Sequence, residues 1–333
     1  TGAYNTGVGT GSLKEQTTGS GNTAVGYWSL RENTTASNNT AVGYSSLFTN
    51  TTGHSNVSLG KSSMEANTTG DSNTAVGFFA FAANTTGSQN TAVGYGALDA
   101  NTTADANTAV GYSALTANTT GYGNTALGSL SLDASTTANN NTSVGRAAMT
   151  TSTTAASNTA MGVSALEALT TGSNNTGLGV AAGGAITTGS ANTCVGSSAS
   201  VSAAAASGQI VIGYNVTSAG NNNFSFGQNN EGVVSNNYAA NASWARGSDE
   251  RLKTNITNDT LGLDFIKDLR TVTFKWKPNN EHPKTFNSYQ ETNVKDTSSV
   301  MHGMIAQEVK TALDTAGVST FGGWVEGQDG TQL

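Results

Sequence analysis

Small apolar residues and glycine recur along the first two-thirds of the chain at one fixed interval. The commonest unit reads N-T-A-V-G-Y-x-A-L-x-A-N-T-T-G-x-x, and its central glycine returns every 17 residues from Gly9 to Gly213. An asparagine four residues before the glycine keeps the same step from Asn5 to Asn192. Fixed-period self-similarity is typical of repeat architectures, in which each unit contacts only its neighbours. The pattern therefore predicts a solenoid.

Within one unit, T-A-V-G-Y alternates as a β-strand does, so the residues at −3, −1 and +1 from the glycine share one face. We expect the −1 residue, such as Val25 or Val42, to fill the core with the large apolar residue at +4, such as Leu30. The glycine marks a bend that needs close packing or a positive φ. The A-N-T-T-G stretch supplies turn residues, so two short strands and two turns are predicted per unit.

Identical residues one period apart would stack along the axis of such a solenoid. Stacked Asn and Thr side chains can hydrogen-bond along a ladder, whereas stacked like charges would repel. The core of one coil is thin, so association with other copies is expected. The sequence leaves open whether tyrosines at +1, such as Tyr27 and Tyr112, lie in that interface or on the exterior.

Charge divides the chain into two parts. Residues 1–247 hold 5 Lys/Arg and 9 Asp/Glu, whereas residues 248–333 hold 9 and 12. This shift predicts a domain boundary near Gly247. The net charge of −7, without a basic cluster, argues against nucleic acid as a partner. No apolar run is long enough to span a bilayer, so no membrane insertion is expected.

Cofactor chemistry finds little support in the sequence. The single cysteine, Cys194, replaces the usual repeat alanine, which favours a small buried side chain over a reactive or metal-binding one. No His/Cys/Asp cluster has metal-ligand spacing and no phosphate loop is present, so neither a metal nor a cofactor is predicted. The acidic residues of the repeats form no recurring pair of the kind that a glycosidase needs.

The repeats resemble the S-V-A-I-G repeats of trimeric autotransporter adhesin heads. The likeness is greatest at I-V-I-G-Y (210–214) and F-S-F-G (224–227), where Gly213 and Gly227 are only 14 residues apart. The resemblance implies a parallel β-roll in a threefold assembly. We therefore predict a shaft of 17-residue coils over 1–196 and a neck with 14-residue repeats over 197–247.

Three segments of the remainder carry a second resemblance. W-A-R-G-S-D-E-R-L-K-T-N-I (244–256), L-G-L-D-F-I-K-D-L-R-T-V-T-F-K-W (261–276) and H-G-M-I-A-Q-E-V (302–309) together resemble the intramolecular chaperone domain of phage tailspikes and tail fibres, peptidase family S74. In that family the domain drives trimerisation of a β-rich fibre and then cuts itself off before the motif serine. The fold class predicted for the whole chain is mainly β, a homotrimeric parallel β-solenoid with a small α+β chaperone domain over 248–333.

By that resemblance, Ser248 is the nucleophile, Lys253 its general base, and Gly247–Ser248 the scissile bond, with His302 as an auxiliary residue. A desolvated lysine with a depressed pKa can activate a serine. The structural alternatives are that Ser248 caps a helix and that His302 only packs. The A-Q-E-V-K-T-A-L stretch predicts a short amphipathic helix, in which Gln307 and Glu308 have structural roles.

Both chain ends suggest a piece of a longer protein. Thr1 and Gly2 already occupy the T-G positions of the repeat, and the family's domain normally continues into a long coiled-coil helix, whereas this chain stops at Leu333. A truncated chaperone module is therefore expected.

The leading functional hypothesis is a homotrimeric shaft of a phage tail fibre, located on the virion, with two further copies of the chain as partners and a host-surface glycan or protein as a candidate receptor. Its enzymatic activity would be at most a single self-cleavage. The alternatives are a polysaccharide depolymerase whose catalytic domain lies outside this chain, a bacterial trimeric adhesin, and an ice-binding solenoid.

Overall fold

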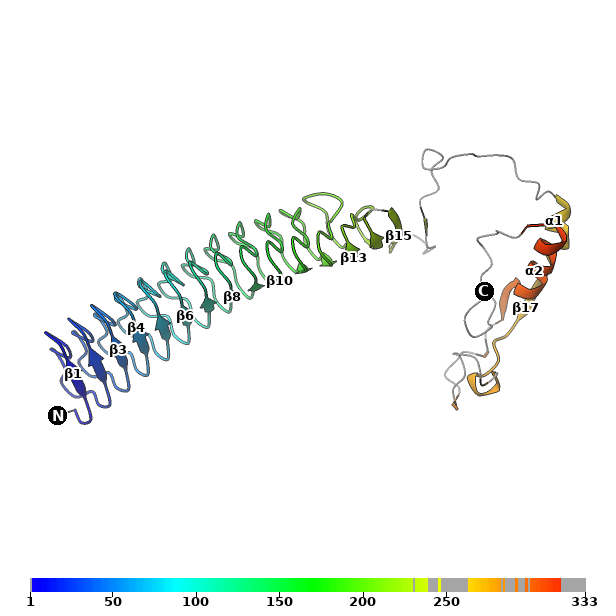
Figure 1. Ribbon diagram of the computed structural model, residues 1–333. Coiled ribbons are helices and arrows are strands. Elements are labelled where there is room, and N and C mark those ends of the chain that lie inside the picture. The colour runs from blue at the N-terminus through cyan, green and yellow to red at the C-terminus, as the bar shows by residue number, and fades with distance from the viewer. Residues whose placement is uncertain are drawn as a thin grey trace. The chain divides into compact units, whose positions relative to one another are not determined.

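The computed structural model divides into two units, Thr1–Ser248 and Asp249–Leu333 (Figure 1). It describes residues 2–229, 231–238, 245–246, 263–282, 284, 291–292, 297–298 and 300–318. Each unit is treated by itself below.

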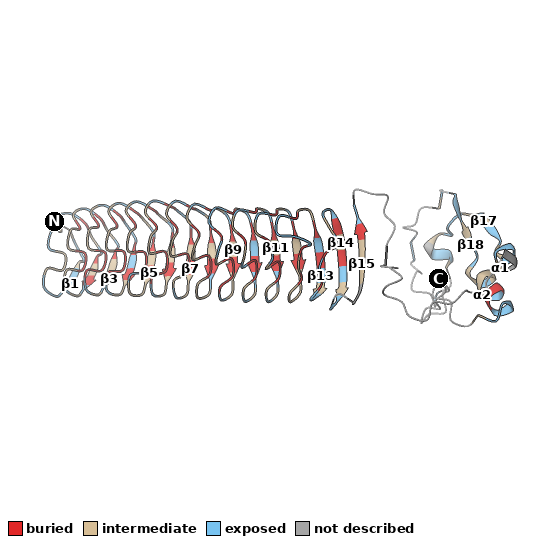
Figure 2. Cartoon of the chain, turned by 90° about the horizontal axis from the view of Figure 1, so that it is seen from above, coloured by how far each residue is buried: buried red, intermediate tan, exposed pale blue. Residues whose placement is uncertain are grey.

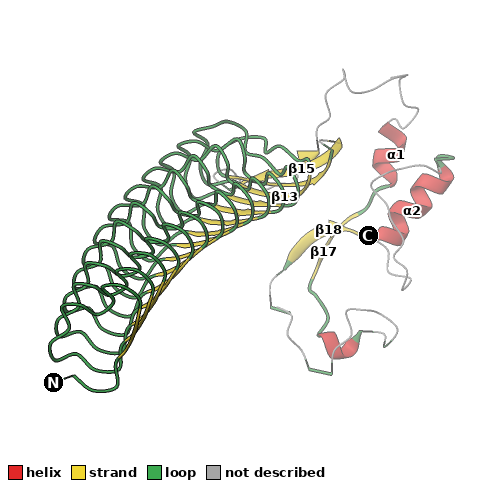
Figure 3. Ribbon diagram, turned by 60° about the vertical axis from the view of Figure 1, so that its left-hand side comes forward, coloured by secondary structure: helices red, strands yellow, loops and turns green. Residues whose placement is uncertain are grey.

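The first unit is a solenoid in which every coil contributes one strand to a single sheet, of order β1 to β16. The first twelve strands have three residues each: Thr6–Val8, Thr23–Val25, Thr40–Val42, Val57–Leu59, Thr74–Val76, Thr91–Val93, Thr108–Val110, Thr125–Leu127, Thr142–Val144, Thr159–Met161, Thr176–Leu178 and Thr193–Val195. Neighbours pair in parallel with a shift of one repeat, as in Thr23↔Thr40. The strands run along one side of the solenoid and loops complete each coil (Figure 3).

The parallel β-solenoid predicted from the repeat is thus confirmed, but the prediction of two strands per unit is wrong. The second half of each coil is a series of turns in which the +2 and +4 residues have positive φ, as at Ser113 (49°) and Leu115 (53°). A left-handed residue cannot continue a strand. The coil therefore closes through turns instead of a second strand.

The sheet ends differently from how it begins. β13 (Ile210–Tyr214) and β14 (Asn223–Gln228) still pair in parallel, and their register places Gly213 opposite Gly227, so the 14-residue step keeps the glycines stacked. β15 (Glu231–Asn237) then pairs antiparallel with β14, and β16 (Ala245–Arg246) pairs antiparallel with β15. The chain reversal ends the stacking of coils.

The core contains columns of small residues at −2 and +3 and a column of large residues at +4. Ala109 and Leu115 illustrate the −2 and +4 columns, and both are fully buried. The same buried positions return from coil to coil (Figure 2). The expectation that the −1 residue fills the core is wrong, because Val25 and Val42 lie on the outer face of the sheet. The −2 position holds a small residue in each strand from β1 to β12, and Ser58 there donates a hydrogen bond to the carbonyl oxygen of Ser63.

The repeat glycines are required for two reasons. Gly111 has a φ of +141°, a region that side chains rarely adopt. A Cβ placed on it would lie 2.5 Å from the carbonyl oxygen of Gly128 in the next coil. Both reasons given for the glycine from the sequence are therefore confirmed.

Two asparagine columns run through the interior of the solenoid. In the first, at +7, each side-chain amide donates to the side-chain oxygen of the previous coil, as Asn67 Nδ2 does to Asn50 Oδ1 at 2.8 Å. In the second, at −4, the oxygen accepts the backbone N–H of the next coil's asparagine, as between Asn56 Oδ1 and Asn73 N. Threonine hydroxyls at +8 donate to the next coil's carbonyl, as Thr68 does to Thr85. The predicted ladders are confirmed.

The second unit is small and mixed. α1 (Leu263–Asp268) precedes β17 (Thr271–Phe274), a short 3₁₀ turn η2 (Asn279–Glu281) follows, and β18 (Met301–Met304) leads into α2 (Ala306–Thr315). β17 and β18 pair antiparallel. The helix predicted for A-Q-E-V-K-T-A-L is confirmed as α2, with Ala312 and Leu313 as its buried residues.

Candidate functional site

The predicted cleavage site lies almost wholly outside the described residues. Gly247, Ser248 and Lys253 have no described placement, so their mutual geometry stays a prediction. His302 is described: it lies on β18, opposite Thr273 of β17, and is exposed. A shallow depression of about 580 Å³ contains it, lined by Thr271, Val272, Thr273, His302, Gly303 and Met304. The auxiliary catalytic role of His302 stays a prediction.

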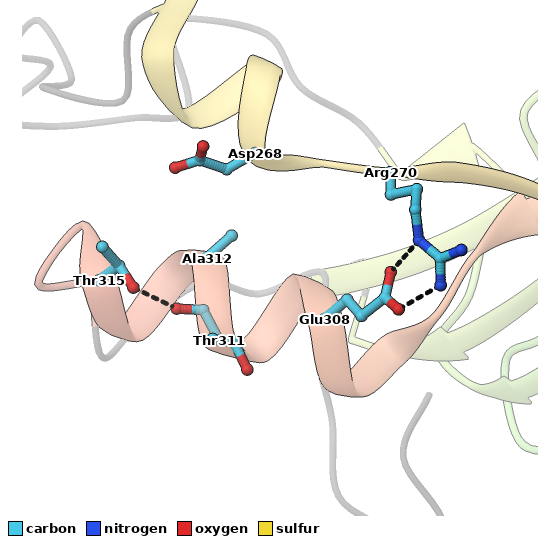
Figure 4. Close-up of a pocket in the computed structure, with 6 residues that line it drawn as sticks. All are labelled: Asp268, Arg270, Glu308, Thr311, Ala312 and Thr315. Atoms are coloured by element: carbon cyan, nitrogen blue, oxygen red, sulfur yellow. Dashed lines mark hydrogen bonds and ion pairs between the residues drawn. The ribbon is translucent and has the colours of Figure 1, made fainter.

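An ion pair joins the start of β17 to α2. Arg270 precedes β17, and its Nε and Nη2 donate to the two carboxylate oxygens of Glu308 at 3.1 and 2.5 Å. Figure 4 shows this two-pronged contact above the helix. The hydrogen bond from Arg270 lowers the pKa of Glu308 below its usual value, and the hydrogen bond to Glu308 raises the pKa of Arg270. The pair fixes the helix to the two-stranded sheet across 38 residues of sequence.

Around this pair lies a second depression of about 400 Å³, lined by Asp268, Arg270, Glu308, Thr311, Ala312 and Thr315. Thr315 donates to the carbonyl oxygen of Thr311 one turn earlier, so its hydroxyl is used within the helix (Figure 4). Both Arg270 and Glu308 are engaged with each other, and no nucleophile with an adjacent base lines the depression. The arrangement is suited to holding α2 in place rather than to chemistry.

The described part of the second unit exposes much of its apolar surface. Large apolar side chains exposed there are Ile266, Trp276, Val300, Met301, Met304 and Ile305. By contrast, Ala312 and Leu313 are the buried apolar residues among those described in this unit.

The solenoid presents its own apolar surface on the outer face of the sheet. We call it the outer stripe: the residue before each repeat glycine from Val8 to Phe226, always Val, Leu, Met, Ile or Phe, together with the residue after the glycine. Those at −1 are half-buried or exposed. Those at +1 include an aromatic series, Tyr27, Tyr44, Phe78, Tyr95, Tyr112 and Tyr214.

The aromatic rings of the outer stripe stack on one another along the solenoid. Tyr95 and Tyr112 have ring centroids 5.3 Å apart with an interplanar angle of 12°, and Phe78 stacks on Tyr95 at 5.4 Å. Lys61 continues the series, because its Nζ lies 5.8 Å from the ring centre of Tyr44 and 5.4 Å from that of Phe78. The tyrosine position that the sequence left open is therefore exterior in the single chain.

Cys194 and the asparagines of the N-T-T segments both lie in the interior of the solenoid. Cys194 is fully buried, and burial raises the pKa of its thiol to about 12, so it is a small core residue as predicted. The N-T-T asparagines, such as Asn33 and Asn84, are buried in the +7 column and inaccessible to a glycosylating enzyme. Among the described residues, no group of His, Cys, Asp and Glu side chains could hold a metal ion, and no helix is long and apolar enough to cross a membrane.

Sequence reasoning missed Arg270 and the outer stripe. Arg270 is one of 14 basic residues, and nothing local marks a partner 38 positions away. The outer stripe did leave a signal. The −2 column admits mostly Gly, Ala, Ser or Cys, as at Gly177 and Cys194, whereas the −1 column admits Val, Leu, Met and Ile. Restriction to small residues marks the inside of a narrow coil.

Comparison with protein-family models gives a match in the C-terminal segment. Residues 248–318 match the protein-family model of peptidase S74, described as chaperone of endosialidase. No curated protein and no solved structure matches the chain. The match covers less than a quarter of the chain and includes α1, β17, β18 and α2. The similarity to this family that the sequence motifs indicated is therefore confirmed for the C-terminal segment.

Proposed function

We propose that the chain is a homotrimeric shaft protein whose C-terminal segment acts as an intramolecular chaperone for the solenoid. The observation that carries the proposal is the similarity of residues 248–318 to the chaperone of endosialidase, directly after a sheet of stacked coils. The exposed apolar side chains of the second unit, Met301, Met304 and Ile305 among them, support it, because three copies could bury them together.

The solenoid creates the need for such a chaperone. Its coils are so alike that a shift of a whole repeat between two chains would bring nearly identical residues together, as the pairs Thr74↔Thr91 and Thr91↔Thr108 show within one chain. Register is weakly specified in such repetitive strands, and long β-structures fold slowly. A separately folding module at one end would set the register before the coils stack.

We also propose that the module releases itself, with Ser248 as nucleophile and Lys253 as general base. The Oγ of Ser248 would attack the carbonyl carbon of Gly247 while its proton passes to Lys253. The peptide C–N bond then breaks as the nitrogen of Ser248 takes up a proton, which leaves an ester. Water hydrolyses that ester and frees both fragments. The step runs once per chain, because the nucleophile is itself part of the product.

Four proteins and one control variant test the proposal, and the four are the full chain, residues 1–247 alone, and the full chain with Ser248→Ala or Lys253→Ala. We expect the full chain to form a trimer that resists denaturing gels, and residues 1–247 made alone to aggregate or misassemble. Both point variants should assemble but keep the C-terminal fragment attached. A Ser72→Ala variant is the matched control and should behave as the unchanged chain, because Ser72 is exposed in a loop and other coils have alanine at its position, as at Ala106.

The outcomes separate the two parts of the proposal. If residues 1–247 assemble alone into the same trimer at the same rate, the chaperone role is wrong. If the unchanged chain never loses its C-terminal fragment, the cleavage is wrong while the chaperone role stands.

The wider setting is proposed from the same similarity. We place the shaft on the tail of a virion, where a host-surface glycan or protein would be its receptor. Antibodies against the solenoid should then label tail fibres of intact particles in electron micrographs, and labelling confined to bacterial surfaces would instead favour an adhesin.

A further inference from the structure

We propose that the outer stripe is the surface through which copies of this chain pack against one another along the shaft. The inference rests on the trimer proposed above and names the face that forms it. It starts from the reversal seen in the fold: the residue at −1, expected inside the coil, points outward in every strand from β1 to β14. A continuous column of Val, Leu, Met, Ile and Phe on the outside of the solenoid is an exposed apolar surface of the kind that another molecule covers.

The size of the stripe suits a protein interface. Leu178 is 43% exposed, Met161 45% and Tyr112 56%. An aromatic side chain carries roughly 150–250 Å² of surface, so the half-exposed tyrosines at +1 alone offer on the order of 500 Å². The aliphatic column adds more than this again, and the total exceeds the ~800 Å² per partner of a standard interface.

Charge is kept away from the stripe. Within the described strands β1–β14, the −3, −1 and +1 positions carry no acidic side chain, and the acidic residues of the coils lie in the loops, as Asp99 and Glu167 do at +5. The basic residues of the stripe are Lys61 and Arg146, and Lys61 lies over two aromatic rings. Depletion of charge with enrichment of aromatic residues is the composition of an interface core.

The stacking of the rings argues against a glycan as the occupant. Sugars bind aromatic side chains through the ring face, but the faces of Tyr95 and Tyr112 are turned toward each other along the axis. What each ring presents outward is its edge and hydroxyl. Ring edges and hydroxyls fit between the side chains of a facing protein surface.

A second copy is the partner whose surface has the matching period. The ridges of the stripe repeat once per coil, at the ~4.8 Å spacing of neighbouring strands. Only a surface with the same spacing can interdigitate with it over fourteen strands, β1 to β14, since any other period falls out of step within a few coils. Another copy of this chain in parallel orientation has the same spacing, because it is built from the same coils.

The test places two carboxylates on the stripe of the full chain. Leu127 and Met161 occupy −1 positions two coils apart, so Leu127→Glu with Met161→Glu adds charge without stacking it. Thr137→Glu with Thr171→Glu is the matched control, in the same two coils but at exposed loop positions. Circular dichroism checks the fold, and sedimentation velocity measures the assembled mass.

We expect the unchanged chain and the control to sediment as trimers, and the stripe variant to be a folded monomer whose association is at least ~100-fold weaker, since each buried unpaired charge is strongly unfavourable. A folded stripe variant that remains trimeric overturns the inference and leaves the proposed function intact. An unchanged chain that is monomeric overturns both.

A second measurement covers the case in which the double variant fails to fold. Met161→Cys and Thr171→Cys each add one thiol, while Cys194 is buried and slow to react. Maleimide should modify Met161→Cys at least ~10-fold more slowly than Thr171→Cys in the assembled protein, because another copy covers it. Equal rates in a trimer would overturn the inference.

Discussion

The solenoid and the C-terminal unit bury apolar surface in different ways. In the solenoid, each coil packs on the coils before and after it, so Leu98 is fully buried although the other buried residues of its own coil are small or polar, such as Ala97 and Asn101. In the described part of the second unit, α2 buries Ala312 and Leu313, while Ile266, Met301 and Met304 stay exposed. The interior of the solenoid thus finds its packing partners in neighbouring coils of the same chain, whereas the described part of the second unit leaves large apolar side chains exposed.

The two units also differ in how polar groups are satisfied. Solenoid side chains bond to a neighbour one repeat away and out of water, as Asn84 does with Asn67 at 2.7 Å. Among the described residues of the second unit, Arg270 and Glu308 form an exposed ion pair. Buried hydrogen bonds are expensive to lose, whereas exposed ion pairs contribute little. Substitutions in the first unit should therefore cost much more than substitutions in the second.

The largest difference should come from glycine. Gly111→Ala puts a Cβ 2.5 Å from the backbone oxygen of Gly128 at a φ of +141°, and we expect it to destabilise the solenoid by about 3 kcal/mol or more. Gly317→Ala, after α2, meets no atom within 4 Å at a φ of +72° and should cost about 1 kcal/mol. Urea unfolding followed by circular dichroism measures both. Equal costs would mean that the coils can shift apart to accept a side chain.

The next effect should come from the asparagine column. Asn67→Ala removes the hydrogen bond that Asn50 Oδ1 accepts and one of the two that Asn84 Nδ2 donates, all inside the protein. Leaving buried polar groups unpaired should cost about 2–3 kcal/mol. Thr69→Ala, exposed in the same coil, is the control and should change the unfolding free energy by less than about 0.5 kcal/mol. A cost as small as the control's would show that water replaces the lost amide.

A gain of stability is expected where the +7 asparagine column ends, after Asn118. Asn118 Oδ1, Ser135 Oγ and Ser152 Oγ are consecutive at the +7 position, and each is buried without a hydrogen-bond partner. Ser135→Asn with Ser152→Asn would continue the ladder and should stabilise the solenoid by about 1 kcal/mol per residue. Thermal unfolding of the double variant against the unchanged chain tests this. A lowered melting temperature would mean that the coils there have closed around serine.

The smallest effect concerns the ion pair of the second unit. Because Arg270 lowers the pKa of Glu308, the pair supports the folded state at neutral pH and loses that contribution as the pH falls through the lowered pKa. Arg270→Gln should raise the pKa of Glu308 toward its usual value, measured by NMR titration of the carboxyl group. Lys310→Gln, which removes the partner of Asp314 one turn away, is the control and should leave Glu308 unchanged.

Much of the fold followed from the repeat, because a period of 17 residues fixes which residues stack, and stacking fixes where Gly, Asn and Thr are useful. The orientation of the strand did not follow. Alternation shows that Thr23 and Val25 share a face, but a strand with apolar residues on both faces does not say which face is inside. Hydrophobicity favoured Val25 as the core residue, whereas the structure buries the smaller Ala24 and leaves Val25 on the outer face.

Only those parts of the candidate site that local sequence motifs encode were predictable. The match at 248–318 and the helix α2 follow from local sequence. The pairing of Arg270 with Glu308 depends on how a strand and a helix meet, which no local pattern encodes. The placement of Ser248 and Lys253 lies outside the described residues, so their chemistry rests on the family similarity.

The register of the solenoid also has a consequence for inheritance. Thr108↔Thr125 and Thr125↔Thr142 are the same pairing one coil apart, and the residues between them close the same path. Deleting or duplicating one coil of 17 residues, which 51 nucleotides of the gene encode, would bring together coils whose contacts already occur elsewhere in the solenoid. The length of this rod can therefore change by unequal recombination in whole steps, without any new contact having to evolve.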